Sequence, residues 1–376
     1  MLREIPAALI SELRSFEAGG PRGTQALEAA ISVALATFVA LFLHSDEPWW
    51  AATSAWMVTR SSLSAALSSG VMRIIGSVAG AAIAVIVIGL FVYDPLPFCL
   101  SLFTVAWVGL YGFAKSRHNS AWLVSAITGN LVMLMALEQP QTTFTIAVNR
   151  VADAMIGTGS ALLVTYLLPA LADTPATPVV NSRRPLPLMF LSRRHAREFE
   201  VWLRENWPLI LHACRGGLTV MLLPLLLNWL APLSSSTMAV TSVAVMAIPT
   251  TAILEADART VVQRAVYRLL GCALGALLGL FCLYWVGSNF PIWLLLLMGG
   301  VWLSSQIQTG STGIAYVGAQ AGLAFLLSMI QSQGPPLSPT PGIDRFAGIM
   351  AGLFLLLIIT MALSLFRLAP PAVQGE

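Results

Sequence analysis

A repeated apolar run of membrane length constrains the fold of this chain more than any other feature. Val71–Phe91 reads VMRIIGSVAGAAIAVIVIGLF, in which an arginine and two glycines four apart open a run of apolar residues. The same pattern returns 195 positions later as VYRLLGCALGALLGLFCLYWV, where Arg268 corresponds to Arg73. About 20 helical residues, at 1.5 Å each, cross the hydrocarbon core of a bilayer. The chain is therefore expected to contain a duplicated set of membrane helices.

Composition agrees with this expectation. Hydrophobic residues make up 57% of the 376 positions and charged residues 10%, and the mean hydropathy is +0.80. A soluble domain carries about 25% charged residues, so the sequence predicts an integral membrane protein with membrane lipids as its surroundings. The net charge of +3 does not indicate nucleic acid, because the arginines are scattered through membrane segments and one linker.

Twelve apolar segments form two sets of six. The first set covers residues 26–43, 49–67, 71–92, 96–114, 121–137 and 148–170, and the second covers 209–230, 237–254, 266–286, 292–307, 313–330 and 346–366. We predict an all-α membrane protein of about twelve transmembrane helices arranged as two parallel six-helix repeats. The predicted divisions are an interfacial segment (1–25), the first repeat (26–170), a basic cytoplasmic linker (171–207), the second repeat (208–367) and a tail (368–376).

Charge in the turns predicts the orientation. Acidic turns containing Asp46, Glu47 and Asp94 alternate with basic turns such as Lys115 to His118. Because lysine and arginine stay cytoplasmic, both termini and the linker are expected inside. An even number of crossings gives the two copies the same orientation, so any central pathway should lie on an axis along the membrane normal.

The second and third helices carry a family resemblance. Trp50-Ala51-Ala52-Thr53-Ser54-Ala55 and the repeated R-x-x-G-x-x-x-G pattern make the chain resemble the fusaric acid resistance and aromatic acid exporter superfamily. The resemblance implies a bacterial inner-membrane exporter of aromatic carboxylates or drugs, working beside a periplasmic adaptor protein. The chain is also distantly similar to plant aluminium-activated malate transporters. That similarity implies an arginine-lined anion pore, which a fused repeat would form between its halves.

Several classes of active site are absent from the sequence. No G-x-x-x-x-G-K-[ST] phosphate-binding loop occurs, which excludes an ATP-driven pump in one chain. The four histidines lie in separate segments without an H-x-x-x-H pair, and the four cysteines lie in apolar runs without C-x-x-C spacing. We therefore expect no metal, no cofactor and no enzymatic activity.

Arginines inside membrane segments are the remaining candidates, since each costs about 2.5–3.5 kcal/mol to insert. If the second helix begins at Trp49, Arg60 lies about 16 Å along it, near the membrane midplane. The alternative is a half-span that ends at Arg60 and is followed by a re-entrant piece. Both alternatives put a cation where an anion can reach it, although a structural ion pair or a snorkelling anchor would also explain Arg60.

The repeated arginines form two further pairs. Arg73 and Arg268 begin the third helix of each copy on the cytoplasmic side, as anchors or as a substrate gate. Arg150 and Arg345 begin the sixth helices on the outside, against the positive-inside bias. Asp153 breaks the repeat, since its copy is a glycine. It is either the i+3 partner of Arg150 or the acid that couples transport to protons.

Five other residues complete the predicted site. Glu28 and Arg215 occupy the same repeat position with opposite charge and are expected to form an ion pair between the halves. Trp56 lies deeper than the other tryptophans and could stack on an aromatic substrate. Asn130 and Gln320 either line the pathway or hydrogen-bond to another helix.

These observations lead to one functional prediction with two alternatives. We predict an exporter of small organic anions, with aromatic carboxylic acids the leading class and Asp153 the residue for proton coupling. A passive anion channel is the first alternative, and a membrane scaffold without transport is the second. A homo-oligomer is compatible with all three.

Overall fold

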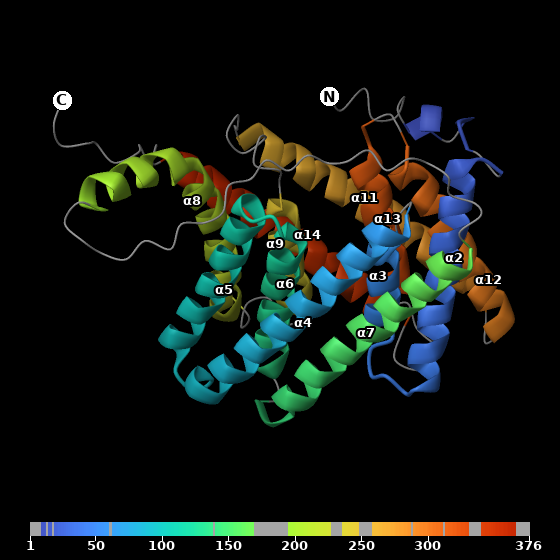
Figure 1. The fold of residues 1–376 in the computed structure, drawn as a ribbon, viewed down its shortest axis with the longest axis horizontal. Helices are drawn as coiled ribbons and strands as arrows, with labels where there is room; N and C mark the ends of the chain where they lie inside the picture. The colour runs from blue at the N-terminus through green and yellow to red at the C-terminus, as the bar shows by residue number, and fades with distance from the viewer. Residues whose placement is uncertain are drawn as a thin grey trace.

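The computed structural model describes residues 9–12, 14–16, 19–59, 62–137, 140–168, 195–226, 235–247, 258–286, 289–310, 313–330 and 340–365. Within these ranges the chain is built from helices and contains no β-strand (Figure 1). The prediction of an all-α architecture is therefore confirmed.

Helices of the first half follow one another with short connections. They are α2 (Pro21–Phe42), α3 (Trp49–Val58), α4 (Leu63–Phe91), α5 (Pro95–Lys115), α6 (Asn119–Ala136) and α7 (Thr143–Leu167), with a single 3₁₀ turn at Pro140–Thr142 before α7. Prolines occupy the first turns of α2 and α5, where a missing N–H removes no helical hydrogen bond.

Helices of the second half have the same order. They are α8 (His195–Leu226), α9 (Ser235–Met246), α11 (Ala258–Val286), α12 (Phe290–Gln308), α13 (Ala315–Met329) and α14 (Thr340–Leu365). Helix α8 begins inside the stretch predicted as linker (171–207), so the last part of that stretch is helical and continuous with the next apolar segment.

Eight helices in the described ranges are long and apolar enough to cross a membrane. They come from α2, α4, α5, α6, α8, α11, α12 and α14. Helices α3 and α9 have only 10 and 12 residues, and α13 has 15. The protein is thus a multi-pass membrane protein in which the second helix of each half is short.

The predicted second span (49–67) is wrong as one continuous helix. Helix α3 ends at Val58, and α4 begins at Leu63, eight residues before the predicted start of the third segment. The side chain of Ser62 caps α4 by accepting a hydrogen bond from the N–H of Ala65, at 3.4 Å. The end of α3 at Val58 agrees with the half-span of the alternative prediction, but the stretch after Ser62, which that alternative made a re-entrant piece, forms the first turns of α4.

Packed helix pairs in the first half have counterparts in the second. Helix α4 packs on α6 and α7, and α11 packs on α13 and α14 in the same way. Helix α3 packs on α2 and α7, as α9 does on α8 and α14. The first helix of each half also packs against the other half: α2 packs on α12, and α8 packs on α5. Figure 1 shows α2 beside α12 at one end of the molecule and α8 beside α5 at the other.

The repeated glycines allow the closest of these contacts. A Cβ at Gly76 or Gly80 would collide with the backbone of α6, and one at Gly271 or Gly275 would collide with the backbone of α13. Small residues let membrane helices approach this closely. The glycines are therefore packing residues, and they hold α4 and α11 against the helices that carry much of the central cavity.

Candidate anion-binding cavity

A cavity of about 700 Å³ lies between the two halves. Helices α3, α4, α6 and α7 of the first half and α9, α11, α13 and α14 of the second contribute its wall. Sites for small molecules typically measure about 300–1,000 Å³, so the cavity is large enough for an organic metabolite.

The wall of the cavity carries an excess of positive charge. Among the residues that the structure describes, its charged side chains are five arginines and two carboxylates: Arg73, Arg150, Arg264, Arg268 and Arg345 against Glu47 and Asp344. The difference is 5 − 2 = +3 charges. Buried cations are costly unless they are paired, so a cavity with this lining favours a negatively charged occupant.

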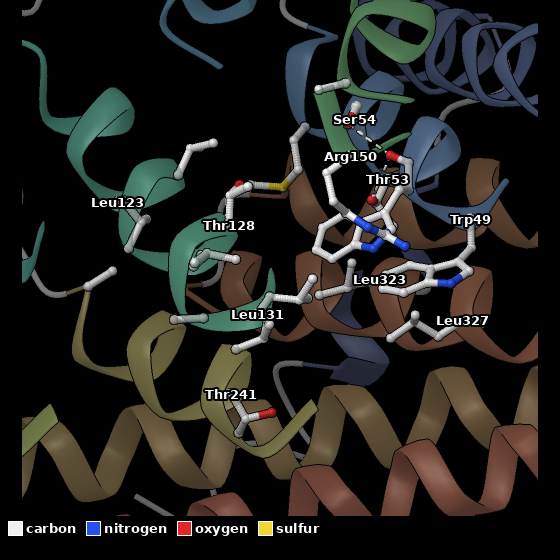
Figure 2. Close-up of a pocket in the computed structure, with 18 of the residues that line it drawn as sticks. Trp49, Thr53, Ser54, Leu123, Thr128, Leu131, Arg150, Thr241, Leu323 and Leu327 are labelled. Carbon is white, nitrogen blue, oxygen red and sulfur yellow. Dashed lines mark hydrogen bonds between the residues drawn. The ribbon is translucent and has the colours of Figure 1, made fainter. Parts of the chain in front are cut away.

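Equivalent residues from the two halves meet on this wall. Arg73 corresponds to Arg268 and Arg150 to Arg345, and all four line the cavity. Thr53 of α3 and Thr241 of α9 also correspond, within the matching triplets Ala-Thr-Ser and Val-Thr-Ser. In Figure 2 Thr53 and Thr241 lie on separate helices on different sides of the cavity.

The first group on the wall, called here the Arg150 cluster, consists of Glu47, Trp49, Trp50, Arg150 and Arg345. Glu47 Oε2 lies 2.7 Å from Arg150 Nη2 in an ion pair. The Cζ atom of Arg150 lies 5.0 Å from the ring centroid of Trp50 and 5.9 Å from that of Trp49. The two indole rings stack on each other with centroids 4.3 Å apart. Arginine over an indole face is a favourable cation–π geometry, and Figure 2 shows Arg150 reaching toward Trp49.

Several donors in the Arg150 cluster are unsatisfied. Among the residues that the structure describes, Nε and Nη1 of Arg150 and the indole Nε1 atoms of Trp49 and Trp50 are buried and have no hydrogen-bond partner. Leaving a buried donor unsatisfied costs about 1–3 kcal/mol, and more for a charged group. All four groups donate, so acceptor atoms of an anion or of water would satisfy them.

A short loop holds the Arg150 cluster in place. Ser45 donates a hydrogen bond to Asp153 at 2.6 Å, and Asn149 donates one to Asp46 at 2.7 Å. Together with the Glu47–Arg150 pair, these bonds fasten the α2–α3 loop along α7. His44, with φ of 55°, turns the chain into the loop.

Arg345 has different partners from Arg150. Its Nη1 donates to the main-chain oxygen of Leu327 at 2.6 Å and, more weakly, to that of Ile330 at 3.5 Å. Its Cζ lies 5.0 Å from the ring centroid of Trp49. Leu327 belongs to the last turn of α13, whose terminal carbonyls lack helical partners. Arg345 therefore caps a helix as well as lining the cavity.

The second group, called here the Arg268 cluster, consists of Arg73, Arg264, Arg268, Tyr316 and Gln320. Arg268 is 2% exposed and donates to Gln320 Oε1 at 2.5 Å and to Thr241 Oγ1 at 3.3 Å. Its Nε has no partner among the described residues. The Cζ of Arg264 lies 4.3 Å from the ring centroid of Tyr316. Both of these acceptors are neutral, so no carboxylate among the described residues forms an ion pair with Arg268.

Arg73 and Arg150 lie at different levels of the cavity. Helices α4 and α7 run antiparallel in Figure 1, and Gly70 of α4 faces Thr158 and Leu162 of α7. At 1.5 Å per residue, this register separates Arg73 from Arg150 by roughly 10 Å along the helices. The cavity thus offers cations at two successive depths.

Some predicted site residues lie elsewhere. Asp153 is 1% exposed, is not part of the cavity wall and accepts a hydrogen bond from Ser45. Trp56 is 2% exposed, packs against Gly322 and borders a separate cavity of about 200 Å³. Arg60 lies outside the described residues.

The structure does not bring Glu28 and Arg215 together. Glu28, on α2, accepts a hydrogen bond from Thr165 of α7. Arg215, on α8, lies on a helix that packs against α5, α9 and α14. Equal repeat positions lie on opposite flanks of the assembly because α2 and α8 each pack against the other half, so the expected ion pair between halves is replaced by the bond within the first half.

Sequence reasoning missed Glu47, Arg264, Trp49 and Trp50 as cavity residues. Glu47 was counted among the acidic turn residues, and the two tryptophans were not assigned to the site. The matching Thr-Ser pairs of α3 and α9 are a signal that could have identified the second helices as cavity-lining.

Comparison with protein families gives two matches along the chain. Residues 24–180 match the fusaric acid resistance protein family, and residues 223–359 match a fusaric acid resistance protein-like family. The first match spans α2 to α7, and the second covers most of the helices from α9 to α14.

Curated relatives match at low identity. The chain is 28% identical over 211 residues to "Uncharacterized transporter YdhK" of Salmonella typhimurium, covering 54% of this chain and 29% of that protein. It is also 28% identical over 201 residues to YdhK of Escherichia coli K12, covering 51% of this chain and 28% of that protein. The chain is also 27% identical over 155 residues to "p-hydroxybenzoic acid efflux pump subunit AaeB" of Salmonella paratyphi A, covering 38% of this chain and 23% of that protein. The alignments thus span less than a third of these relatives, and no solved structure matches the chain.

Proposed function

Because the chain belongs to the fusaric acid resistance family of membrane transporters, we propose that its central cavity binds small organic anions for export across the bacterial inner membrane. Aromatic carboxylic acids are the proposed class. This class is favoured by the name of the AaeB relatives, which are p-hydroxybenzoic acid efflux pump subunits, and by the tryptophans beside Arg150.

The observation that carries the proposal is the group of unsatisfied donors in the Arg150 cluster. Buried nitrogen donors of Arg150, Trp49 and Trp50 have no acceptor among the described residues. They lie on the wall of a cavity whose described charged residues carry three more positive than negative charges. Charge-assisted hydrogen bonds to a carboxylate are about twice as strong as neutral ones. An aromatic acid supplies both a carboxylate for Arg150 and an apolar ring for the apolar part of the wall, which includes Leu131 and Leu323.

The proposed topology is twelve crossings in two parallel repeats, with both termini cytoplasmic. The matched packing of helix pairs supports a pseudo-twofold axis through the cavity. On this topology the Arg150 cluster faces the periplasm and the Arg268 cluster faces the cytoplasm, so an anion leaving the cell meets the Arg268 cluster first. The periplasmic adaptor that the resemblance implies would receive the cargo beyond the Arg150 cluster.

Export of p-hydroxybenzoate from proteoliposomes tests this function. We expect wild-type protein to move the labelled acid faster than protein-free liposomes, and Arg150→Gln to abolish the difference while keeping a wild-type elution profile and melting curve. The neutral amide, p-hydroxybenzamide, should not be moved. Equal flux of acid and amide, or full activity of Arg150→Gln, would contradict an arginine-based anion site.

Coupling to protons is a separate part of the proposal and rests on Asp153. This carboxylate is buried in α7 and holds the loop that carries Glu47. Under an imposed proton gradient, Asp153→Asn should lose acceleration by the gradient but retain downhill flux. Downhill flux that never responds to the gradient in the wild type would instead indicate a passive anion channel.

A further inference from the structure

We propose that Glu47 is an internal competitor of the cargo: its carboxylate occupies Arg150 in the empty cavity and must leave before an organic anion can bind there. This inference rests on the proposed function and deepens it. Glu47 then sets the apparent affinity of the transporter for carboxylates.

The geometry of the ion pair supports a competitor. A guanidinium offers two edges with two parallel donors each, and Nη2 belongs to both edges. Glu47 Oε2 binds Nη2 at 2.7 Å, while Nε and Nη1 remain without partners among the described residues. A carboxylate that grips arginine well uses two donors of one edge. Glu47 therefore leaves Nε and Nη1 of Arg150 without an acceptor. Because it binds Nη2, which both edges share, it also blocks two-point binding of a cargo carboxylate at either edge.

Glu47 is the partner of the pair that is able to move. Its side chain is 28% exposed, whereas that of Arg150 is 6% exposed. Arg150 is further held beside the rings of Trp49 and Trp50. A partly exposed carboxylate regains water when it turns away, so separation avoids most of the penalty of leaving a buried charge unpaired. Arg150 avoids that penalty as well when the cargo carboxylate takes over.

The backbone under Glu47 is anchored, which confines the movement to its side chain. Asp46 is bound to Asn149, and Ser45 is bound to Asp153. The Glu47 N–H also faces Ser45 Oγ at 3.3 Å. Three contacts thus fix the loop up to the backbone of Glu47, and only the side-chain torsions of Glu47 need to change.

Exchange of one carboxylate for another has a thermodynamic consequence. The apparent dissociation constant equals the intrinsic constant divided by the fraction of protein with Arg150 available. An ion pair of ordinary strength at a partly exposed position keeps that fraction low. Removing the competitor should therefore tighten binding without adding any contact to the cargo.

Calorimetric titration of the purified full-length protein with p-hydroxybenzoate tests the inference. We expect Glu47→Gln to lower the dissociation constant roughly fivefold relative to wild type. Asp46→Asn is the matched control, because it removes the same charge one residue away and retains an acceptor for Asn149. This control should change the constant by less than about twofold, since its charge does not contact Arg150.

The outcomes separate this inference from the proposed function. Tighter binding to Glu47→Gln alone supports the competitor, and so does binding that appears only in Glu47→Gln. If wild type and Glu47→Gln bind equally, or if Asp46→Asn tightens binding as much, the competitor is overturned while the anion site stands. If neither wild type nor Glu47→Gln binds the acid, the proposed function and the inference fail together.

Discussion

Arg150 and Arg345 occupy the same position in the two repeats, yet they have different partners. Arg150 binds one carboxylate and retains unsatisfied donors beside two indole rings. Arg345 instead donates hydrogen bonds from Nη1 to main-chain oxygens at the end of α13. The duplicated cation has therefore diverged. One copy is available to a ligand, whereas the other stabilises the helix end that forms the opposite wall.

The largest expected effect separates the copies by binding. Arg150→Gln should weaken binding of p-hydroxybenzoate at least about tenfold, because a charge-assisted hydrogen bond contributes about 1.5–3 kcal/mol. Arg345→Gln should weaken it much less. Titration of both variants against wild type measures the difference, with p-hydroxybenzamide as the uncharged control. Equal losses in the two variants would mean that the repeats share the anion symmetrically.

The next effect separates the copies by stability. Arg345→Gln leaves the carbonyls of Leu327 and Ile330 without their donor, and we expect a loss of about 1–3 kcal/mol in unfolding free energy. Thermal melting in one detergent, compared with Arg150→Gln, measures it. A larger destabilisation by Arg150→Gln would reverse the assignment of structural and ligand-binding copies.

The smallest effect concerns the rings between the arginines. The guanidinium groups of both Arg150 and Arg345 lie over the ring of Trp49. Of these two arginines, Arg150 alone lies over the ring of Trp50. Double-mutant cycles combine Trp49→Leu or Trp50→Leu with Arg345→Gln and compare the unfolding free energies from thermal melting. We expect a coupling free energy of about 0.5–1 kcal/mol between Trp49 and Arg345 and none between Trp50 and Arg345. Coupling of the same size for Trp50 would show that the two arginines act through one ring stack.

Residues copied between the repeats were the ones that sequence could predict. Arg73, Arg268, Arg150 and Arg345 stood out because each pair recurs at a fixed spacing, and all four line the cavity. Asn130 and Gln320 were predicted either to line the pathway or to bond another helix. Gln320 lines the cavity and accepts a hydrogen bond from Arg268 of α11, whereas Asn130 donates to Ala126 within its own helix. The glycines of α4 and α11 recur with these arginines, and the structure shows them at close contacts between helices.

Features without a copy were harder to predict. Glu47 meets Arg150 across a loop and a helix far apart in the chain, and no periodicity links two such residues. The end of α3 at Val58 was also ambiguous, because apolar residues resume soon afterwards, although Ser62 is a capping signal. Glu28 and Arg215 show the limit of repeat reasoning, since equal positions come together only when they face the symmetry axis.

The packing of α2 and α8 against the opposite halves has a consequence for assembly. Helix α2 packs on α12 and α8 packs on α5, so neither half completes its own surface. A half produced alone would expose the face meant for its counterpart, and a second copy of that half would present the complementary face. The single chain is in this sense a covalently joined dimer. Two separately synthesised halves should associate through these faces, with covalent continuity serving to fix their ratio at one to one.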